Sequence, residues 1–173
     1  MVQNLTFLSL IQLVLSIFMG VFFMWLTYKV FLRWFGKQYK LLDLNLAVAI
    51  LLAGVLFSTG YIISGTLSPL LNTLRIISRN NPSIGSLLLD SSRYLAEFLS
   101  LGFMVALLVN YMAIALFNAL TPEKDELKEI SENQVQYSII LAAILVVMAL
   151  FAREAYISLL DSLVPFNPLP TIF

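Results

Sequence analysis

Long apolar runs alternate with short polar connections along the chain, and this pattern predicts four transmembrane helices. The runs cover about residues 5–28, 44–64, 94–120 and 135–160, and the first contains no charged residue. A helix of about 20 residues crosses a hydrocarbon layer of roughly 30 Å, and it satisfies its own backbone hydrogen bonds there. We therefore predict an all-α, polytopic membrane protein.

The polar connections predict where these helices begin and end. Aromatic and basic residues around Trp25 mark the far end of the first helix, because amphipathic rings and long cationic side chains favour the headgroup region. We expect Gly36 to end this helix. We also expect Asp43 to cap the second helix, and Asp90 or Ser91 to cap the third.

Two further segments are too short to span a bilayer. Residues 70–79 repeat apolar positions at helical spacing with arginines on other sides, which is typical of a helix lying in the membrane interface. The tail 165–173 is apolar and rich in proline, so we expect it to lie on the membrane or on a neighbouring subunit.

Composition supports the membrane assignment and excludes several kinds of chemistry. The chain is 60% hydrophobic and 12% charged, with a mean hydropathy of +0.92. Its net charge is zero and its basic residues are scattered, which argues against a nucleic-acid partner. Cysteine and histidine are absent, and no phosphate-binding loop or nucleophile–base pair is present. We expect no enzymatic activity, no cofactor and no metal.

The segment 121–133 separates the last two apolar runs and holds five of the ten acidic residues. Thr121 and Pro122 are typical of a helix start, where the helix dipole favours the acids that follow. A solvated charged face explains this pattern, and contact with a partner is the functional alternative. We predict that Glu129 and Asn133 share one helical face toward the first connection or a neighbouring subunit. Alternatively, Asn133 satisfies backbone groups at the membrane entry.

Polar residues inside the third and fourth runs need partners, because hydrocarbon penalises unpaired charge. Glu97 has two candidate partners, Arg93 one turn away and Arg153 on the fourth helix. We favour a structural ion pair over a transport site. Asn110, near the middle of the third run, is expected to hydrogen-bond across helices.

Small residues recur on the second and fourth helices. In lipid they allow two backbones to approach closely, so they predict helix contacts. The residues assigned to this packing are Ala49, Ala53, Gly54, Gly60, Ser138, Ala142 and Ala149.

The two halves of the chain, 1–80 and 81–173, follow the same order of elements. Placing Asn45 on Asn133 aligns them with a shift of 88 positions. Each half contributes two helices that return to the same side, so the predicted repeats are parallel.

The motif residues resemble a known family. Thr121-Pro122, Asp125-Glu126, Glu129-Ile130 and Asn133 are similar to the TP, DE, EI and N positions of domain of unknown function 350, the YjfL-like bacterial inner-membrane proteins. Residues 45–54 are similar to its N-x-A-x-A-I-x-x-x-G run, so the resemblance implies two tandem copies. Glu132 stands where the family usually has a glycine. The resemblance implies four helices and no established activity, with some members encoded beside membrane-stress proteins of the phage-shock type.

Lysine and arginine counts predict the orientation. The connections before Asn45 and Asn133 carry six, and the opposite face carries four, which places loop 121–133 in the cytoplasm and both termini outside. We expect a self-associating scaffold or accessory subunit that presents this acidic loop to a membrane-stress or other protein partner. The alternative is an oligomeric ion or small-solute channel or transporter component, with a pathway lined by Glu97, Asn110, Gln134, Gln136 or Arg153.

Overall fold

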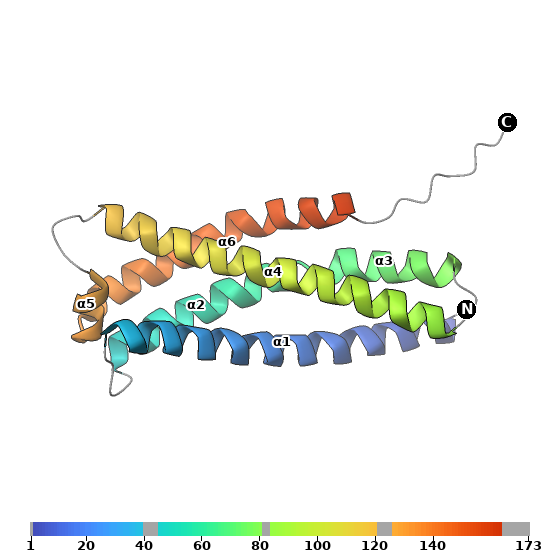
Figure 1. The fold of residues 1–173 in the computed structure, drawn as a ribbon, viewed down its shortest axis with the longest axis horizontal. Coiled ribbons are helices and arrows are strands. Elements are labelled where there is room, and N and C mark those ends of the chain that lie inside the picture. Colours follow the sequence, from blue (N-terminus) through green and yellow to red (C-terminus); the bar gives the residue numbers. More distant parts are fainter. Residues whose placement is uncertain (1, 40–44, 81–83, 121–125, 164–173) are drawn as a thin grey trace.

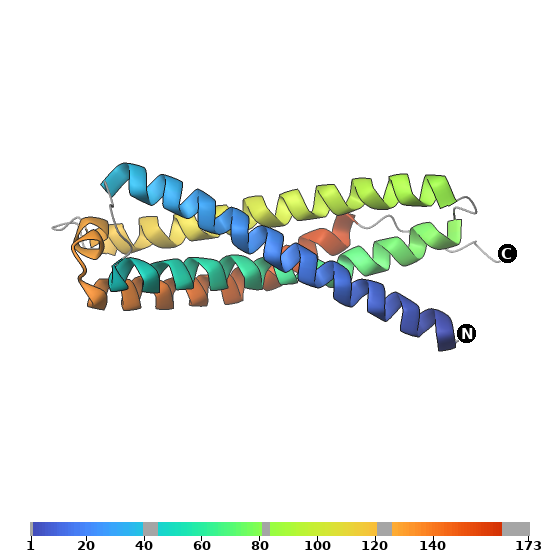
Figure 2. The same ribbon diagram turned by 90° about the horizontal axis from the view of Figure 1, so that it is seen from below.

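The computed structural model describes residues 2–39, 45–80, 84–120 and 126–163, and these residues form six helices. They are α1 (Val2–Tyr39), α2 (Leu46–Ser64), α3 (Leu67–Asn80), α4 (Ile84–Leu120), α5 (Glu126–Ser131) and α6 (Val135–Leu163). The long helices run along one axis, and the short α5 lies across one end of the bundle (Figures 1 and 2). The described residues contain no strand, which confirms the all-α prediction. Four stretches within them are long and apolar enough to cross a membrane: Ile17–Tyr39, Leu46–Thr73, Ala96–Leu120 and Val135–Leu163.

Helix α2 is the central element of the bundle. It packs against α1, α4 and α6, and its contact with α6 is the most extensive between any two of the described helices. Helices α2 and α6 both begin at the end of the bundle where α5 lies, whereas α1 and α4 finish there (Figures 1 and 2). The start of α1 and the end of α6 therefore lie toward the other end, away from the motif segment.

Local chemistry explains where α2 begins and ends. The side-chain Oδ1 of Asn45 accepts a hydrogen bond of 2.8 Å from the Val48 backbone N–H, so Asn45 is the N-cap. The predicted cap, Asp43, lies outside the described residues. At the other end, the N–H of Gly65 bonds to the carbonyl of Ile62 at 3.0 Å, and the N–H of Thr66 bonds to the carbonyl of Ile63 at 2.9 Å.

Two predicted helix ends are wrong. Helix α1 continues through Gly36 to Tyr39, and α4 begins at Ile84, so Asp90 and Ser91 lie inside it. A single glycine disfavours a helix interior by only about 1 kcal/mol, and serine or aspartate by less. Such residues do not stop a helix that has favourable sequence on both sides.

Helix α3 differs from the expected surface segment. It continues in the direction of α2 and runs beside the first part of α4 (Figures 1 and 2). Leu70 of α3 is fully buried in a cluster with Phe98, Tyr156 and Leu160. This segment is therefore part of the bundle. The tail 165–173 lies outside the described residues.

The packing face of α2 includes only part of the predicted small-residue set. A side chain added at Gly54 would place its Cβ 2.9 Å from the Cβ of Ala142, so these helices meet at close range. Ala149 is fully buried, and Gly60 faces the side chain of Met24. Ala49 and Ala53 are exposed in the single chain, which corrects their assignment to this contact. The contact face is rotated because α2 is apolar all round, and shape rather than polarity selects the side that packs.

Gly54 and Ala142 are separated by 88 positions, as Asn45 and Asn133 are. Parallel α2 and α6 thus meet at positions that the proposed repeat would make equivalent. The tandem repeat itself stays a prediction.

Candidate functional site

Asn45 joins the start of α2 to the end of α5. While its Oδ1 caps α2, its amide Nδ2 donates to the Ser131 carbonyl at 2.8 Å and to the Ile130 carbonyl at 3.4 Å. The last carbonyls of a helix have no partner within that helix. One side chain therefore satisfies backbone groups of two helices that lie more than 80 residues apart in sequence.

Asn133 makes the reciprocal connection. Its Oδ1 accepts a hydrogen bond of 3.2 Å from the Ala47 N–H in the first turn of α2. Its backbone has φ 70°, the left-handed conformation that asparagine tolerates better than most residues. We call these two residues and their bonds the asparagine clasp.

The left-handed Asn133 also ends α5. Its N–H bonds to the Ile130 carbonyl at 3.1 Å, and the Gln134 N–H bonds to the Glu129 carbonyl at 3.0 Å. This pair of bonds is the Schellman arrangement at a helix C-terminus. Because α5 ends before Asn133, Glu129 and Asn133 do not share a helical face, and that prediction is wrong. The geometry instead matches the alternative in which Asn133 satisfies backbone groups at the entry to α2.

The described motif residues divide into buried and accessible positions. Ile130 is fully buried in the core, Glu129 is partly buried, and Glu132 is exposed with Lys128 at 3.9 Å. Residues 121–125, including Thr121, Pro122 and Asp125, lie outside the described residues, so the predicted helix start there is not described. The described part of the motif, residues 126–133, therefore forms a packed cap on the end of the bundle.

Glu126, the first residue of α5, is the unexpected member of this segment. Only 1% of its surface is exposed, and neither carboxylate oxygen has a hydrogen-bond partner. Burial raises the pKa of this carboxyl above its ordinary value, because removing water disfavours the charged form. Position alone suggested a solvated charge, and no feature of the sequence distinguished Glu126 from its acidic neighbours.

The sequence pattern of the family described as Domain of Unknown Function (DUF350) matches residues 2–156, which is most of the chain. The chain belongs to the DUF350 family. No curated protein and no solved structure matches it. The family assignment predicted from the motif residues is thus confirmed, and the motif's asparagines are the residues that form the clasp.

Two arginines of this DUF350 protein pair with glutamates close to them in sequence. Arg93 Nε lies 2.9 Å from Glu97 Oε1, and both side chains are exposed at the start of the apolar stretch Ala96–Leu120. Arg153 instead contacts Glu154 at 3.0 Å and lies over the ring of Tyr61 at 5.0 Å. Of the two partners considered for Glu97, the structure has the one on its own helix.

Hydroxyl groups supply the partners that sequence reasoning missed. Asn110 is buried, as expected of an interhelical contact, and its Nδ2 donates to Thr59 Oγ1 at 2.9 Å. The Tyr156 hydroxyl donates to the Phe98 carbonyl at 3.0 Å and lies 2.8 Å from Thr66 Oγ1. The only sequence signal for these bonds was a hydroxyl residue inside an apolar run, which is too common to identify a pair.

Proposed function

We propose that this DUF350 protein is a non-catalytic, self-associating scaffold or accessory subunit of the bacterial inner membrane. Segment 121–133 lies on the cytoplasmic side, and its described part, from α5 to Asn133, forms a cap that is offered to a partner protein. The asparagine clasp is the observation that carries the proposal. It holds α5 against the start of α2, and α5 also packs on α6. A surface held in place loses less conformational entropy on binding than a free loop does.

The chemistry of the cap favours a basic partner surface. Glu132 is exposed, and Glu123 and Asp125 add two more acidic residues to the same segment. Glu126 is removed from this surface by its burial, so it serves the packing of the cap rather than contact with the partner.

Exposed small residues support self-association. Ala49 and Ala53 lie four positions apart on the exposed side of α2, where a second backbone can approach closely. Native mass spectrometry from lipid nanodiscs should detect an oligomer. Replacing both alanines with leucine should shift it toward monomer, whereas Ala119→Leu, an exposed change at the end of α4, should not. A wild-type monomer would contradict this part of the proposal.

The partner contact is tested in cells with a photo-crosslinking residue at position 132, and at exposed Ser158 of α6 as the matched control. We expect a protein adduct at 132 that Asn133→Ala weakens, and none at 158. Equal crosslinking at positions 132 and 158 would show that the cap is not a specific contact surface. A reporter fused after Phe173 should be active only outside the cytoplasm.

A channel component is the second candidate, favoured by one observation. The buried hydroxyls of Ser58 on α2 and Ser138 on α6 have no hydrogen-bond partner, although both lie in apolar spans. Flux of ions or solutes through proteoliposomes that responds to Glu97→Gln or Asn110→Leu would select this function over the scaffold.

A further inference from the structure

Helices α2 and α6 lie side by side in parallel, and they meet where Gly54 faces Ala142, 88 positions later in the sequence. When two parallel helices touch at equivalent positions, a local two-fold axis relates them. Helix α4 packs on both helices of this pair from one side. The axis creates an equivalent place on the opposite side, and no other long helix that the structure describes packs on both α2 and α6 there. We call this place the open side.

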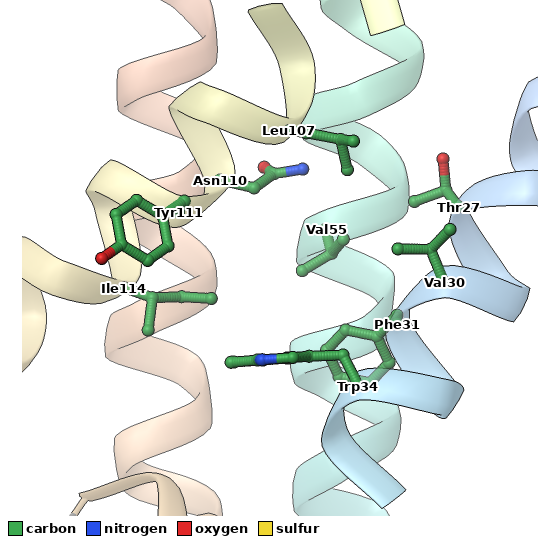
Figure 3. A pocket seen from close by; sticks show the side chains of 9 residues that line it. All are labelled: Thr27, Val30, Phe31, Trp34, Val55, Leu107, Asn110, Tyr111 and Ile114. Carbon is green, nitrogen blue, oxygen red and sulfur yellow. The ribbon is translucent and has the colours of Figure 1, made fainter. Parts of the chain in front are cut away.

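The contact of α4 with α2 indicates which residues the open side presents. Asn110 Nδ2 donates to Thr59 Oγ1 at 2.9 Å, and Figure 3 shows Asn110 and Val55 on the walls of one cavity. Thr59 and Val55 are both buried. A shift of 88 positions carries Val55 to Ala143 and Thr59 to Val147, which are exposed on α6. The surface of α6 that corresponds to a covered surface of α2 is therefore exposed in the single chain.

The buried residues of α4 also have equivalents on α1. Five of these buried residues recur at helical spacing: Gly102, Ala106, Asn110, Ala113 and Phe117. The residues 88 positions earlier form what we call the α1 stripe: Val14, Phe18, Phe22, Trp25 and Lys29. All five are exposed, and their spacing of three or four residues places them on one side of α1. Helix α1 thus repeats the pattern that α4 buries, but exposes it.

Helix α1 of the same chain does not occupy the open side. It packs on α2 through a different face, which includes the buried residues Phe23, Thr27 and Phe31. Among the described residues, α1 has no extensive contact with α6. The α1 stripe therefore points away from its own chain, so a helix of this pattern reaches the open side only from a second copy.

Lys29 makes lipid alone a poor cover for the α1 stripe. Thr27 and Val30 line the same cavity as Asn110, so Lys29 lies close to the depth of Asn110 (Figure 3). Asn110 is near the middle of the apolar stretch Ala96–Leu120. A lysine that faces hydrocarbon at this depth is strongly disfavoured, whereas a neighbouring protein surface can supply polar groups within reach of its long side chain.

The register of α4 on α2, carried to α1 and α6, also matches charges. It brings the exposed basic residues Arg33 and Lys37 of α1 to the level of Gln136 and Glu132, which are exposed near the start of α6. Among the described residues, no acidic side chain forms an ion pair with Arg33 or Lys37. An amide oxygen and a carboxylate thus lie where the two unpaired cations arrive, which favours a second copy over a partner of other charge.

We propose that α1 of one copy packs on α2 and α6 of a second copy, in the place equivalent to that of α4. Phe22 then lies against Val147 of the second copy. Ala53 lies in the same contact, because its equivalent Leu141 packs in one cluster with Phe117 of α4. The inference rests on the self-association in the proposed function, and it identifies the backbone that approaches the exposed alanines of α2.

Disulfide crosslinking tests the contact, because the chain has no cysteine of its own. Two differently tagged copies, one with Phe22→Cys and one with Val147→Cys, are expressed together and oxidised with copper phenanthroline in native membranes. Both positions are exposed, so the substitutions leave the fold intact. The matched control replaces Phe22→Cys with Gly20→Cys, which is exposed at nearly the same depth on another side of α1 and has nothing within 4 Å of its added Cβ. We expect a mixed-tag dimer severalfold above this control.

Charge reversal provides a second measurement on the same crosslink. Lys37→Glu in the Phe22→Cys copy, or Glu132→Lys in the Val147→Cys copy, should lower the mixed dimer about twofold to fivefold, the range for an exposed ion pair. Both reversals together should restore it. The same reversals placed in the opposite copies should not lower it.

Three results would overturn the proposal. A mixed dimer no stronger than the Gly20→Cys control would mean that lipid or another protein covers the α1 stripe. Phe22→Cys dimers as abundant as the mixed dimer would mean that two stripes face each other. A wild-type oligomer in native mass spectrometry without the mixed dimer would leave the proposed self-association standing but remove this contact, whereas a wild-type monomer would remove both.

Discussion

Replacing Gly54 with alanine should destabilise the bundle, although alanine is the better helix former. The added Cβ would lie 2.9 Å from the Cβ and 3.0 Å from the Cα of Ala142. Carbon atoms pack best at about 3.5–4.0 Å, so α2 and α6 must separate by roughly half an ångström or more. The obstacle is backbone and a Cβ, neither of which can rotate away.

The magnitude follows from two opposed effects. Overpacking a close contact costs about 1–3 kcal/mol, whereas glycine to alanine in a helix gains up to about 1 kcal/mol. The gain is smaller in lipid, because a membrane-embedded unfolded chain keeps its helices. We expect a net loss of about 1–2 kcal/mol in the free energy of unfolding.

Unfolding by SDS in mixed micelles, followed by circular dichroism and fluorescence, measures this loss. Gly20→Ala is the matched control, because nothing lies within 4 Å of its added Cβ, and it should be neutral or slightly stabilising. Gly60→Ala meets only the flexible Met24 side chain and should change stability little. Removing the opposing methyl with Ala142→Gly should rescue Gly54→Ala in part in the double variant, because the contact with the Ala142 Cα remains.

Steric conflict with Ala142 is excluded if Gly54→Ala is as stable as Gly20→Ala. The conflict is also excluded if the Gly54 and Ala142 substitutions have additive effects on stability, because the two positions would then not be coupled.

Three further substitutions have defined outcomes in the same unfolding assay. Asn133→Ala should lower the free energy of unfolding by about 2–3 kcal/mol, because it loses a hydrogen bond and holds alanine in a left-handed conformation. Asn133→Gly loses only the hydrogen bond and should lower it by about 1 kcal/mol. Equal losses would show that the left-handed backbone does not contribute. Burial raises the pKa of Glu126, so the folded state holds this proton more tightly, and its unfavourable contribution grows as pH rises through the ordinary value of 4.5. Glu126→Gln should therefore be more stable than wild type at pH 7 but not at pH 4, whereas Glu132→Gln should show no such difference. Tyr156→Phe should lose about 1–2 kcal/mol, more than Thr66→Val does, because it removes both bonds of the hydroxyl.

The class of fold and the family could be predicted from the amino-acid pattern alone. Four apolar runs must become helices in lipid, because no other open structure satisfies the backbone there. The fourth run, predicted from 135, begins as helix α6 at Val135. The Arg93–Glu97 pair could also be predicted, because residues four apart on a helix are neighbours whatever the rest of the fold is.

The clasp was only partly predictable. Alignment of the two halves singled out Asn45 and Asn133, and the backbone role of Asn133 was one of the alternatives considered. The backbone groups that these two asparagines satisfy depend on α5 ending before Asn133. The left-handed conformation of Asn133 sets that end. A continuous helical pattern in the sequence concealed this break.

Tertiary structure alone decided which faces pack and which polar groups meet. Asn110 bonds to Thr59, which is 51 positions away in sequence, and Tyr156 bonds to Thr66, which is 90 positions away. Glu126 is buried, while Ala49 and Ala53 are not. The physical reason is that lipid and protein interior are equally apolar, so hydrophobicity does not fix the rotation of a membrane helix. Shape does, through close contacts such as that of Gly54 with Ala142, and shape exists only once the helices are assembled.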